Sequence, residues 1–340
     1  VAIHPAAGVR GAWDGGGGWG ERQRAEHSLT IFTHHPFTLS ITLKSCLLRR
    51  GITKMNKIEA LLIEDDCLSA MAAIPSGSVN LILCDLPYGT TQNAWDSVIP
   101  LDKLWKHYRR ILAPKGVVAL MSQGPFTARV ILSQESIFKY KVTWVKSKPT
   151  NFLNAKKQPL RKHEDICIFY PQQPNYTPQM QPGEAYDKGV RKNQLTGSYG
   201  DFRPAHIKSE GGRYPTDVVY FKTSESEGRV WHPTQKPVEL GRYLIRTYTN
   251  PGDVVLDNTF GSGSFLVAAA MEKRRCIGIE MNDAIVEFKK ERMDLIEVAQ
   301  NRLARIVPTS ACVTIRSNQL QSLRGSINSF VAQGSVEIAA

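Results

Sequence analysis

Short apolar runs alternate with amphipathic segments along most of the chain after Met55. Continuous apolar runs, such as VNLILC at residues 79–84, are typical of parallel strands that are covered on both faces of a sheet. Other segments, such as LDKLWKHYRRIL at residues 101–112, place apolar side chains at helical spacing. This alternation predicts a doubly wound α/β fold whose central sheet is mostly parallel.

The same patterns predict the individual elements. We expect strands at residues 57–66, 79–85, 116–122, 140–147, 165–170, 253–258 and 275–282. We expect helices at residues 67–74, 101–112, 237–249, 264–274 and 284–306. The alternation is lost in residues 171–231, where Pro, Gln, Tyr and Gly dominate, and this stretch is predicted to be an insertion.

Both ends of the chain lack a regular pattern. Residues 1–54 are glycine-rich or apolar without a helical period, and they predict a poorly structured N-terminal extension. Residues 309–340 are polar and unpatterned, and they predict a loose C-terminal tail. The folded domain is therefore expected to comprise residues 55–170 and 232–308, with the insertion at 171–231 between its two parts.

Charge and cysteine usage narrow the class of protein. The formal net charge is +12, and residues 141–231 contain fifteen Lys and Arg against nine Asp and Glu. This excess fits a polyanionic partner, and it fits a solvated surface equally well. The six cysteines are widely spaced without a CxxC pair, which favours reduced thiols in the cytoplasm over disulfides or a metal site. No apolar run reaches the roughly 18 residues of a membrane span.

A glycine turn, DNTFGSGSF at residues 257–265, joins a predicted strand to a predicted helix. Gly261 and Gly263 allow the backbone to approach a ligand closely and to present N–H groups at the start of a helix. The dinucleotide fingerprint needs a third glycine where this chain has Leu266, so a pyrophosphate site is disfavoured. Taken alone, the turn is equally consistent with a loop that binds nothing.

Three acidic residues at strand ends point to a different ligand. Glu280 ends the strand after the glycine turn and is placed to accept the two hydroxyls of a ribose. Asp257 is placed to accept an ammonium group, and Asp66 to accept an adenine amino group. Ribose, ammonium and adenine are the parts of S-adenosylmethionine, which contains no diphosphate.

The tetrapeptide Asp85-Leu86-Pro87-Tyr88 follows the buried strand at residues 79–84. The exocyclic amino nitrogen of a nucleic-acid base is a poor nucleophile because its lone pair is delocalised into the ring. Asp85 can accept one of its protons and the Leu86 carbonyl the other, which returns electron density to the nitrogen. Pro87 biases Leu86 away from the helical conformation, and Tyr88 offers a ring on which a flipped-out base can stack. The tetrapeptide alone is also consistent with a structural turn.

Three motifs together resemble the amino-group DNA methyltransferases, which use S-adenosylmethionine. DLPY resembles their catalytic tetrapeptide, DNTFGSGSF their cofactor loop, and HPTQKPVEL at residues 232–240 the segment before that loop. The motif order resembles the circularly permuted β class. The resemblance therefore implies a permuted Rossmann-like methyltransferase sheet, double-stranded DNA as partner and a basic target-recognition region at residues 171–231. It leaves open a homodimer and a cognate restriction endonuclease.

The resemblance also implies roles for further residues. Phe260, Gly261 and Gly263 would contact the cofactor, and four residues of the HPTQKP segment would lie against its methionine end: His232, Thr234, Lys236 and Pro237. The leading Asp85 resembles the adenine-N6 enzymes, whereas cytosine-N4 enzymes more often begin with Ser. A cytosine-N4 enzyme of the same fold and a catalytically inactive nucleic-acid-binding relative remain alternatives.

Other polar residues receive less specific predictions. His163 and Glu164 are expected to form loop hydrogen bonds rather than to act in catalysis, and Trp95 and Asp96 to hold the loop after Tyr88. Six basic residues are expected to contact DNA phosphates: Lys146, Lys148, Lys156, Lys157, Arg161 and Lys162. No metal site is expected.

Overall fold

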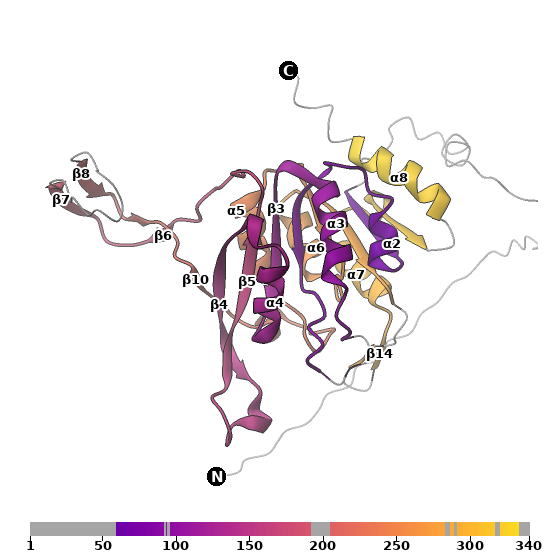
Figure 1. The fold of residues 1–340 in the computed structure, drawn as a ribbon, viewed down its shortest axis with the longest axis horizontal. Coiled ribbons are helices and arrows are strands. Elements are labelled where there is room, and N and C mark those ends of the chain that lie inside the picture. The colour runs from indigo at the N-terminus through magenta and orange to yellow at the C-terminus, as the bar shows by residue number, and fades with distance from the viewer. Residues whose placement is uncertain are drawn as a thin grey trace, which may run out of the picture. The chain divides into compact units, whose positions relative to one another are not determined.

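A nine-stranded sheet forms the centre of the computed structural model (Figure 1), which describes residues 59–91, 93, 96–191, 205–282, 286–288, 291–316 and 320–332. The predicted extension at residues 1–54 and the side chain of Trp95 lie outside the described residues. The strands occur in the order β10 (Val218–Phe221), β4 (Phe138–Thr150), β5 (Arg161–Phe169), β3 (Leu112–Ser122), β2 (Val79–Cys84), β11 (Val254–Asp257), β12 (Arg275–Glu280), β1 (Ala60–Glu64) and β15 (Cys312–Arg316).

Within this sheet, β5 runs antiparallel to its neighbours β3 and β4, and the other pairs are parallel. The prediction of a mostly parallel sheet is thus confirmed. Strands β2 and β11 lie side by side, with Leu81 opposite Val255 and Ile82 opposite Leu256. The DLPY tetrapeptide and the glycine turn follow these two strands, so the sheet brings their carboxyl ends together.

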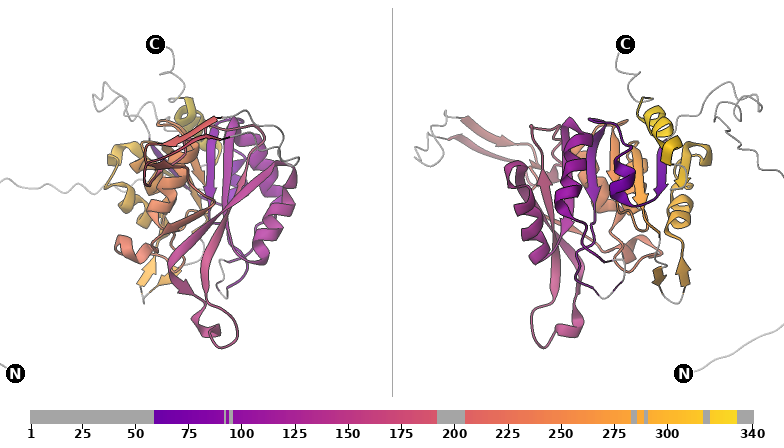
Figure 2. Two further views of the ribbon diagram at one scale, coloured as in Figure 1. Left: turned by 90° about the vertical axis from the view of Figure 1, so that its left-hand side faces the viewer. Right: turned by 45° about the vertical axis from the view of Figure 1, so that its right-hand side comes forward.

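Helices cover both faces of the sheet, as Figure 2 shows. Four helices pack on one face: α2 (Cys67–Met71), α3 (Leu101–Ile111), α4 (Pro125–Ser133) and α8 (Leu320–Ala332). Three helices pack on the other: α5 (Val238–Tyr248), α6 (Ser264–Met271) and α7 (Leu295–Leu303). Among the described residues, no helix is long and apolar enough to cross a bilayer.

The predicted loose tail at residues 309–340 is wrong over most of its described part. Residues Cys312–Arg316 form β15, which pairs in parallel with β1 at the edge of the sheet. Helix α8 follows and buries Ile327 and Phe330 against the sheet. The strand has five residues that mix apolar and polar side chains, so its signal in the sequence is weak.

The predicted long helix at residues 284–306 is correct only in its second half. Strands β13 (Val286–Phe288) and β14 (Glu291–Met293) form a hairpin, and helix α7 begins only at Leu295. The side chain of Asp294 caps α7 by accepting a hydrogen bond from the backbone N–H of Glu297 at 3.0 Å. An Asp followed three residues later by a Glu is a sequence signal for a helix start, and it marks this boundary.

The predicted insertion at residues 171–231 is too long. Its last part contains β10, which belongs to the main sheet and pairs in parallel with β4. Two small antiparallel pairs lie between the sheet strands β5 and β10: β6 (Gln181–Pro182) with β9 (Gly212–Arg213), and β7 (Tyr186–Arg191) with β8 (Ala205–Ser209). Sequence patterns missed β10 because its four residues are flanked by polar and glycine-rich segments.

Candidate active site

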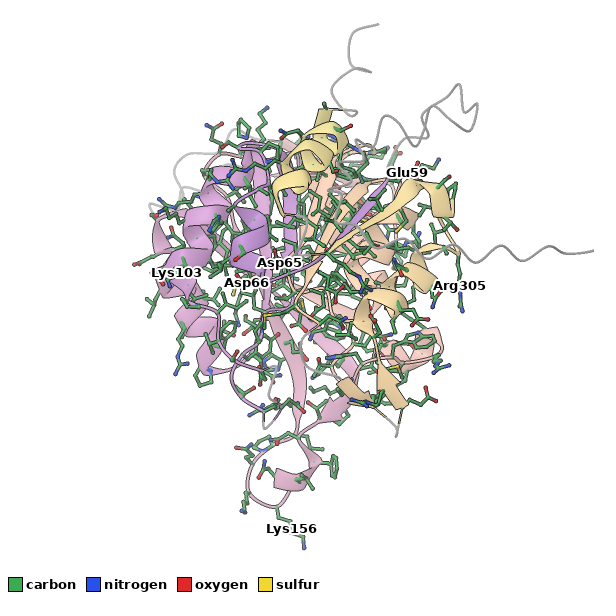
Figure 3. The ribbon with its side chains drawn as sticks, turned by 90° about the vertical axis from the view of Figure 1, so that its right-hand side faces the viewer. Glu59, Asp65, Asp66, Lys103, Lys156 and Arg305 are labelled. Carbon is green, nitrogen blue, oxygen red and sulfur yellow. The ribbon has the colours of Figure 1, made fainter. Side chains whose placement is uncertain are left out.

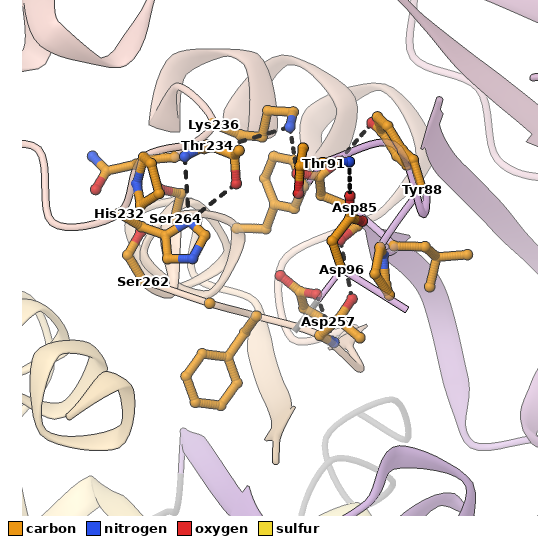
Figure 4. A pocket seen from close by; sticks show the side chains of 18 of the residues that line it. Asp85, Tyr88, Thr91, Asp96, His232, Thr234, Lys236, Asp257, Ser262 and Ser264 are labelled. Atoms are coloured by element: carbon orange, nitrogen blue, oxygen red, sulfur yellow. Dashed lines mark hydrogen bonds and ion pairs between the residues drawn. The ribbon is translucent and has the colours of Figure 1, made fainter. Parts of the chain in front are cut away.

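A cavity of about 700 Å³ lies beyond the carboxyl ends of the strands. Its volume is in the usual range for small-molecule and cofactor sites. The cavity brings most of the predicted site residues together, as Figure 4 shows for several of them. The lining includes Asp66, Asp85, Leu86, Pro87, Tyr88, His232, Thr234, Lys236, Asp257, Phe260, Gly261 and Glu280. Pro237 and Gly263 do not line the cavity, and they are the N-cap residues of α5 and α6.

Asp85, the first residue after β2, receives two polar contacts. Its Oδ1 accepts a hydrogen bond from the Tyr88 hydroxyl at 2.7 Å, and its Oδ2 pairs with the Lys236 ammonium (Figure 4). Burial raises the pKa of Asp85 above its usual value, and Lys236 opposes that effect. Asp85 is thus a partly desolvated carboxylate that already accepts from two donors.

The rest of the tetrapeptide fixes this geometry. The Tyr88 ring stacks on Phe126 of α4, with ring centroids 4.9 Å apart and an interplanar angle of 27°. The Leu86 side chain is buried in the core beneath the site. Leucine at this second position therefore has a packing role, and the residue also lines the cavity. The loop that follows is held by Asp96, which accepts from the backbone N–H groups of residues 89–91 at 2.7–2.9 Å, as predicted.

A second carboxylate, Glu164, lies beside the pair of Lys236 and Asp85. Glu164 is part of β5, so the predicted loop position is wrong. Its Oε1 lies 3.0 Å from Lys146 Nζ, and its Oε2 lies 3.6 Å from Lys236 Nζ. Burial alone would raise the pKa of Glu164, but the two ammonium groups outweigh it and lower the value. Burial would likewise lower the pKa of Lys236, but Asp85 and Glu164 raise it, so this side chain stays charged at neutral pH.

Lys146 does not lie on the DNA-facing surface that was predicted for it. Its residue is only 3% exposed, and its ammonium group pairs with Glu164 inside the cavity. The expectation of a phosphate contact is wrong for this lysine, because its strand faces the core at this position. The other five predicted phosphate contacts are exposed: Lys148, Lys156, Lys157, Arg161 and Lys162.

Residues of the HPTQKP segment line the same cavity. Lys236 forms an ion pair with Asp85, a contact that the sequence did not indicate. His232 is buried, and burial, with a smaller effect of Lys236, lowers its pKa to about 4. Its neutral Nδ1 lies 3.0 Å from Thr234 Oγ1 and accepts from the Thr234 backbone N–H. Pro237 is the N-cap residue of α5.

The glycine turn links β11 to α6 as predicted. Gly261 has a φ of +53°, and a Cβ added there would meet no atom within 4 Å. Its N–H donates to Glu280 Oε2 at 2.7 Å, which ties the turn to the end of β12. Asp257 is 2% exposed, and burial raises its pKa well above the usual value. Asp66 caps α2 by accepting from the Ser69 N–H at 2.9 Å.

Arg302 of α7 supports this turn from behind, and sequence reasoning did not identify it. Its Nη1 donates to the Ser262 carbonyl at 2.6 Å and to Ser264 Oγ at 3.2 Å. Burial lowers the pKa of Arg302 to about 10, so the guanidinium keeps its charge at neutral pH. No local motif marks this arginine, because its partners lie about 40 residues earlier in the chain.

These residues fit S-adenosylmethionine, the cofactor implied by the motifs. The space in front of Gly261 leaves room for a ligand close to the backbone. Glu280 and Asp66 supply oxygen acceptors suited to hydroxyl and amino groups, and Asp257 is a carboxylate suited to an ammonium group. The cavity extends from these acceptors to Asp85, so one space holds the residues predicted to bind the cofactor and those predicted to bind a base.

Comparison with known proteins identifies the family of this chain. A family model for DNA methylases of the N6/N4 type matches residues 79–291. This chain belongs to that family. It is 29% identical over 252 residues to the DNA adenine methyltransferase YhdJ of Escherichia coli. The matched region covers 69% of this chain and 82% of the relative. It is 24% identical over 245 residues to the type II methyltransferase M.HpaI of Haemophilus parainfluenzae, covering 68% and 74%.

Among solved structures, the chain of this methylase is similar to an M1.HpyAVI–SAM complex, with 19% identity and a TM-score of 0.49. That match covers 72% of this chain and 98% of the other. The resemblance read from the three motifs is confirmed at the level of the family: the chain is a DNA methyltransferase of the N6/N4 type.

Proposed function

We propose that this methylase transfers a methyl group from S-adenosylmethionine to the N6 amino group of an adenine flipped out of double-stranded DNA. The observation that carries the proposal is the shared cavity, which Asp85 and Tyr88 line together with the Gly261 turn and Glu280. Adenine is favoured over cytosine by the leading Asp85 and by the relative named as an adenine methyltransferase.

The base-gripping residues act on the amino nitrogen. Asp85 accepts one N–H of the target and the Leu86 carbonyl accepts the other, which localises the lone pair on the nitrogen. The Tyr88 ring, held by Phe126, offers a surface for stacking on the extruded base. Since Tyr88 and Lys236 already contact the carboxylate, the target must displace or share one of them. Asp85 is then placed to take the proton that the amino group loses.

Other residues of the same cavity would hold the cofactor, whose sulfonium supplies the activated methyl group when bound. Glu280 would bind the ribose hydroxyls, Asp66 the adenine amino group and Asp257 the ammonium group. Gly261 and Phe260 would form the floor, and His232 and Thr234 would border the methionine end. Each of these groups lines the cavity.

The test is base analysis after reaction. Purified protein is incubated with S-adenosylmethionine and unmodified genomic DNA, and the DNA is hydrolysed to nucleosides for mass spectrometry. We expect N6-methyldeoxyadenosine, and its absence from the Asp85→Ala reaction. N4-methyldeoxycytidine would replace the adenine assignment by the cytosine one. Cofactor binding without any methylated base would identify an inactive relative.

A further inference from the structure

Two large apolar side chains project from the tip of the hairpin formed by β4 and β5. Phe152 is 75% exposed and Leu153 is 84% exposed, both in the 3₁₀ turn η2 (Phe152–Asn154). Figure 3 shows this tip, marked by Lys156, standing clear of the body of the domain. Most large apolar residues of the described chain are buried. Two adjacent exposed ones at a projecting tip therefore indicate a surface that binds another molecule.

The tip is held in one conformation rather than left as an open loop. The backbone N–H of Asn154 donates to the Asn151 carbonyl at 3.1 Å, and that of Ala155 donates to the Phe152 carbonyl at 3.1 Å. The Asn154 side chain also donates to Asn151 Oδ1 at 2.7 Å. Asn151 adopts the left-handed region with a φ of +68°, which asparagine tolerates. Preorganisation of this kind lowers the entropy cost of binding.

The charge around the tip fits a nucleic acid. Residues 148–162 contain five Lys and Arg and no Asp or Glu, and all five basic residues are exposed. They flank Phe152 and Leu153 on both sides in the sequence. Basic side chains that bind phosphates, together with apolar side chains that enter between bases, are how several proteins bend or open a duplex.

Residues next to Phe152 and at the start of β5 form part of the catalytic cavity. Thr150, Asn151 and Arg161 line it together with Asp85 and Tyr88. Arg161 Nη1 also donates to Gln123 Oε1 at 3.2 Å, which ties the hairpin to the rim. A duplex that presents a base to Asp85 would therefore lie close to Phe152 and Leu153, which follow Asn151 in the chain.

We propose that Phe152 and Leu153 enter the DNA stack and fill the space vacated by the extruded target base. The inference rests on the proposed function and adds a partner surface to it. Extruding a base costs stacking and pairing energy, and an apolar wedge in the gap hinders the base from returning. The neighbouring lysines would hold the phosphates on either side of the gap.

The test compares two duplexes that carry the methylation site found by sequencing DNA after reaction with the wild-type protein. In one duplex the target base is paired, and in the other it faces an abasic position, so that it leaves the stack easily. For Phe152→Ala/Leu153→Ala we expect kcat/KM on the paired duplex to fall about tenfold or more, and on the abasic duplex to change less than about threefold. A 2-aminopurine at the target position should show a smaller fluorescence increase on binding the variant.

Leu132→Ala is the matched control, because Leu132 is 71% exposed on α4 and does not line the cavity. It should leave both rates unchanged, and all three proteins should bind S-adenosylmethionine equally. An equal loss on the two duplexes would reduce the tip to a general DNA contact and overturn the wedge. Unchanged rates on both would overturn it as well. Failure of the wild-type protein to methylate any DNA would instead refute the proposed function, and the wedge with it.

Discussion

Lys236 and Asp85 form an ion pair inside the cavity although 151 residues separate them in the chain. The ammonium group of Lys236 also lies 3.6 Å from Glu164, and Glu164 in turn pairs with Lys146. The carboxylate that is proposed to grip the target base thus belongs to a buried row of alternating charges. The consequences of this row can be measured.

Replacing Asp85 by Ala should abolish methylation and leave cofactor binding nearly intact. The carboxylate acts on the target amino group, and Lys236 keeps Glu164 as a partner. We expect kcat to fall by about 10²-fold or more, with the Kd for S-adenosylmethionine from calorimetry within about threefold of the wild-type value. Asp85→Asn, which keeps the shape, controls for packing. Loss of cofactor affinity would move Asp85 to the cofactor site.

Gly261→Val should have the opposite effect. Its side chain would occupy the open space in front of the turn, and we expect cofactor affinity to fall about tenfold or more. Gly77→Val is the control, because Gly77 also has a positive φ, +66°, and free space around it, but does not line the cavity. Both variants carry a similar backbone strain. Equal cofactor affinity in the two would show that the Gly261 turn is not a cofactor site.

Lys236→Met should destabilise the fold in a way that depends on pH. Without the ammonium group, Asp85 and Glu164 become two buried like charges, and their folded-state pKa values rise. The variant then loses stability as the pH rises above the ordinary glutamate pKa of 4.5. We expect a deficit of about 3 kcal/mol at pH 8 and a smaller one at pH 5, from denaturant unfolding.

In the wild-type protein, Glu164 should cause no loss of stability as the pH rises above 4.5. The pKa of Glu164 is lowered in the folded state, so its contribution to stability is present above 4.5 and is lost as the pH falls through the lowered value. Lys236→Met/Glu164→Gln should recover part of the loss at pH 8. A deficit that is the same at both pH values would mean that lost packing, and not charge, destabilises the variant.

Arg302→Met should weaken cofactor binding indirectly, through the glycine turn that Arg302 holds. Arg302 holds the Ser262 carbonyl and the Ser264 hydroxyl, so its removal loosens the turn. We expect the Kd for S-adenosylmethionine to rise about tenfold. Arg305→Met, at an exposed position of the same segment, should change it little. If the two variants bind the cofactor alike, the turn does not depend on Arg302.

Phe330→Ala should reveal the contribution of the C-terminal helix α8. Phe330 is fully buried against the sheet, and removing its ring leaves a cavity. We expect the free energy of unfolding to fall by about 3 kcal/mol, while methylation per folded molecule is unchanged. Ser329→Ala, at an exposed neighbour, is the control. Unaltered stability would argue that α8 is dispensable.

The central fold and most of the cavity could be predicted because their signals are local. Asp85, Gly261 and Glu280 each follow a buried strand, and parallel strands place their carboxyl ends at one edge of a sheet. The family relationship rests on three contiguous motifs for the same reason. These residues needed no knowledge of distant contacts.

The ion-pair row could not be predicted, because it depends on register between distant strands. Glu164 lies opposite Trp144 in the antiparallel β4–β5 pair, and this register brings it to Lys146. No feature near Glu164 in the sequence reveals this ion pair. For Lys146 a signal did exist. Val142, Trp144 and Lys146 alternate along β4, so they share one face, and that face is buried. The positive charge of Lys146 suggested a side chain in contact with solvent or a DNA phosphate. The alternation of buried positions along β4 indicated instead a side chain on the buried face.

The pairing of β2 with β11 has a further consequence for the exchange of segments between related methylases. The proposed chemistry is anchored by two strands that are neighbours in space, while the small pairs β6–β9 and β7–β8 lie between them in the chain and outside the main sheet. Exchange of the segment that carries these small pairs for one from another methylase would therefore leave β2 and β11 in register. On the prediction that this segment recognises the target, such grafts should alter which DNA sequence is modified while preserving the reaction.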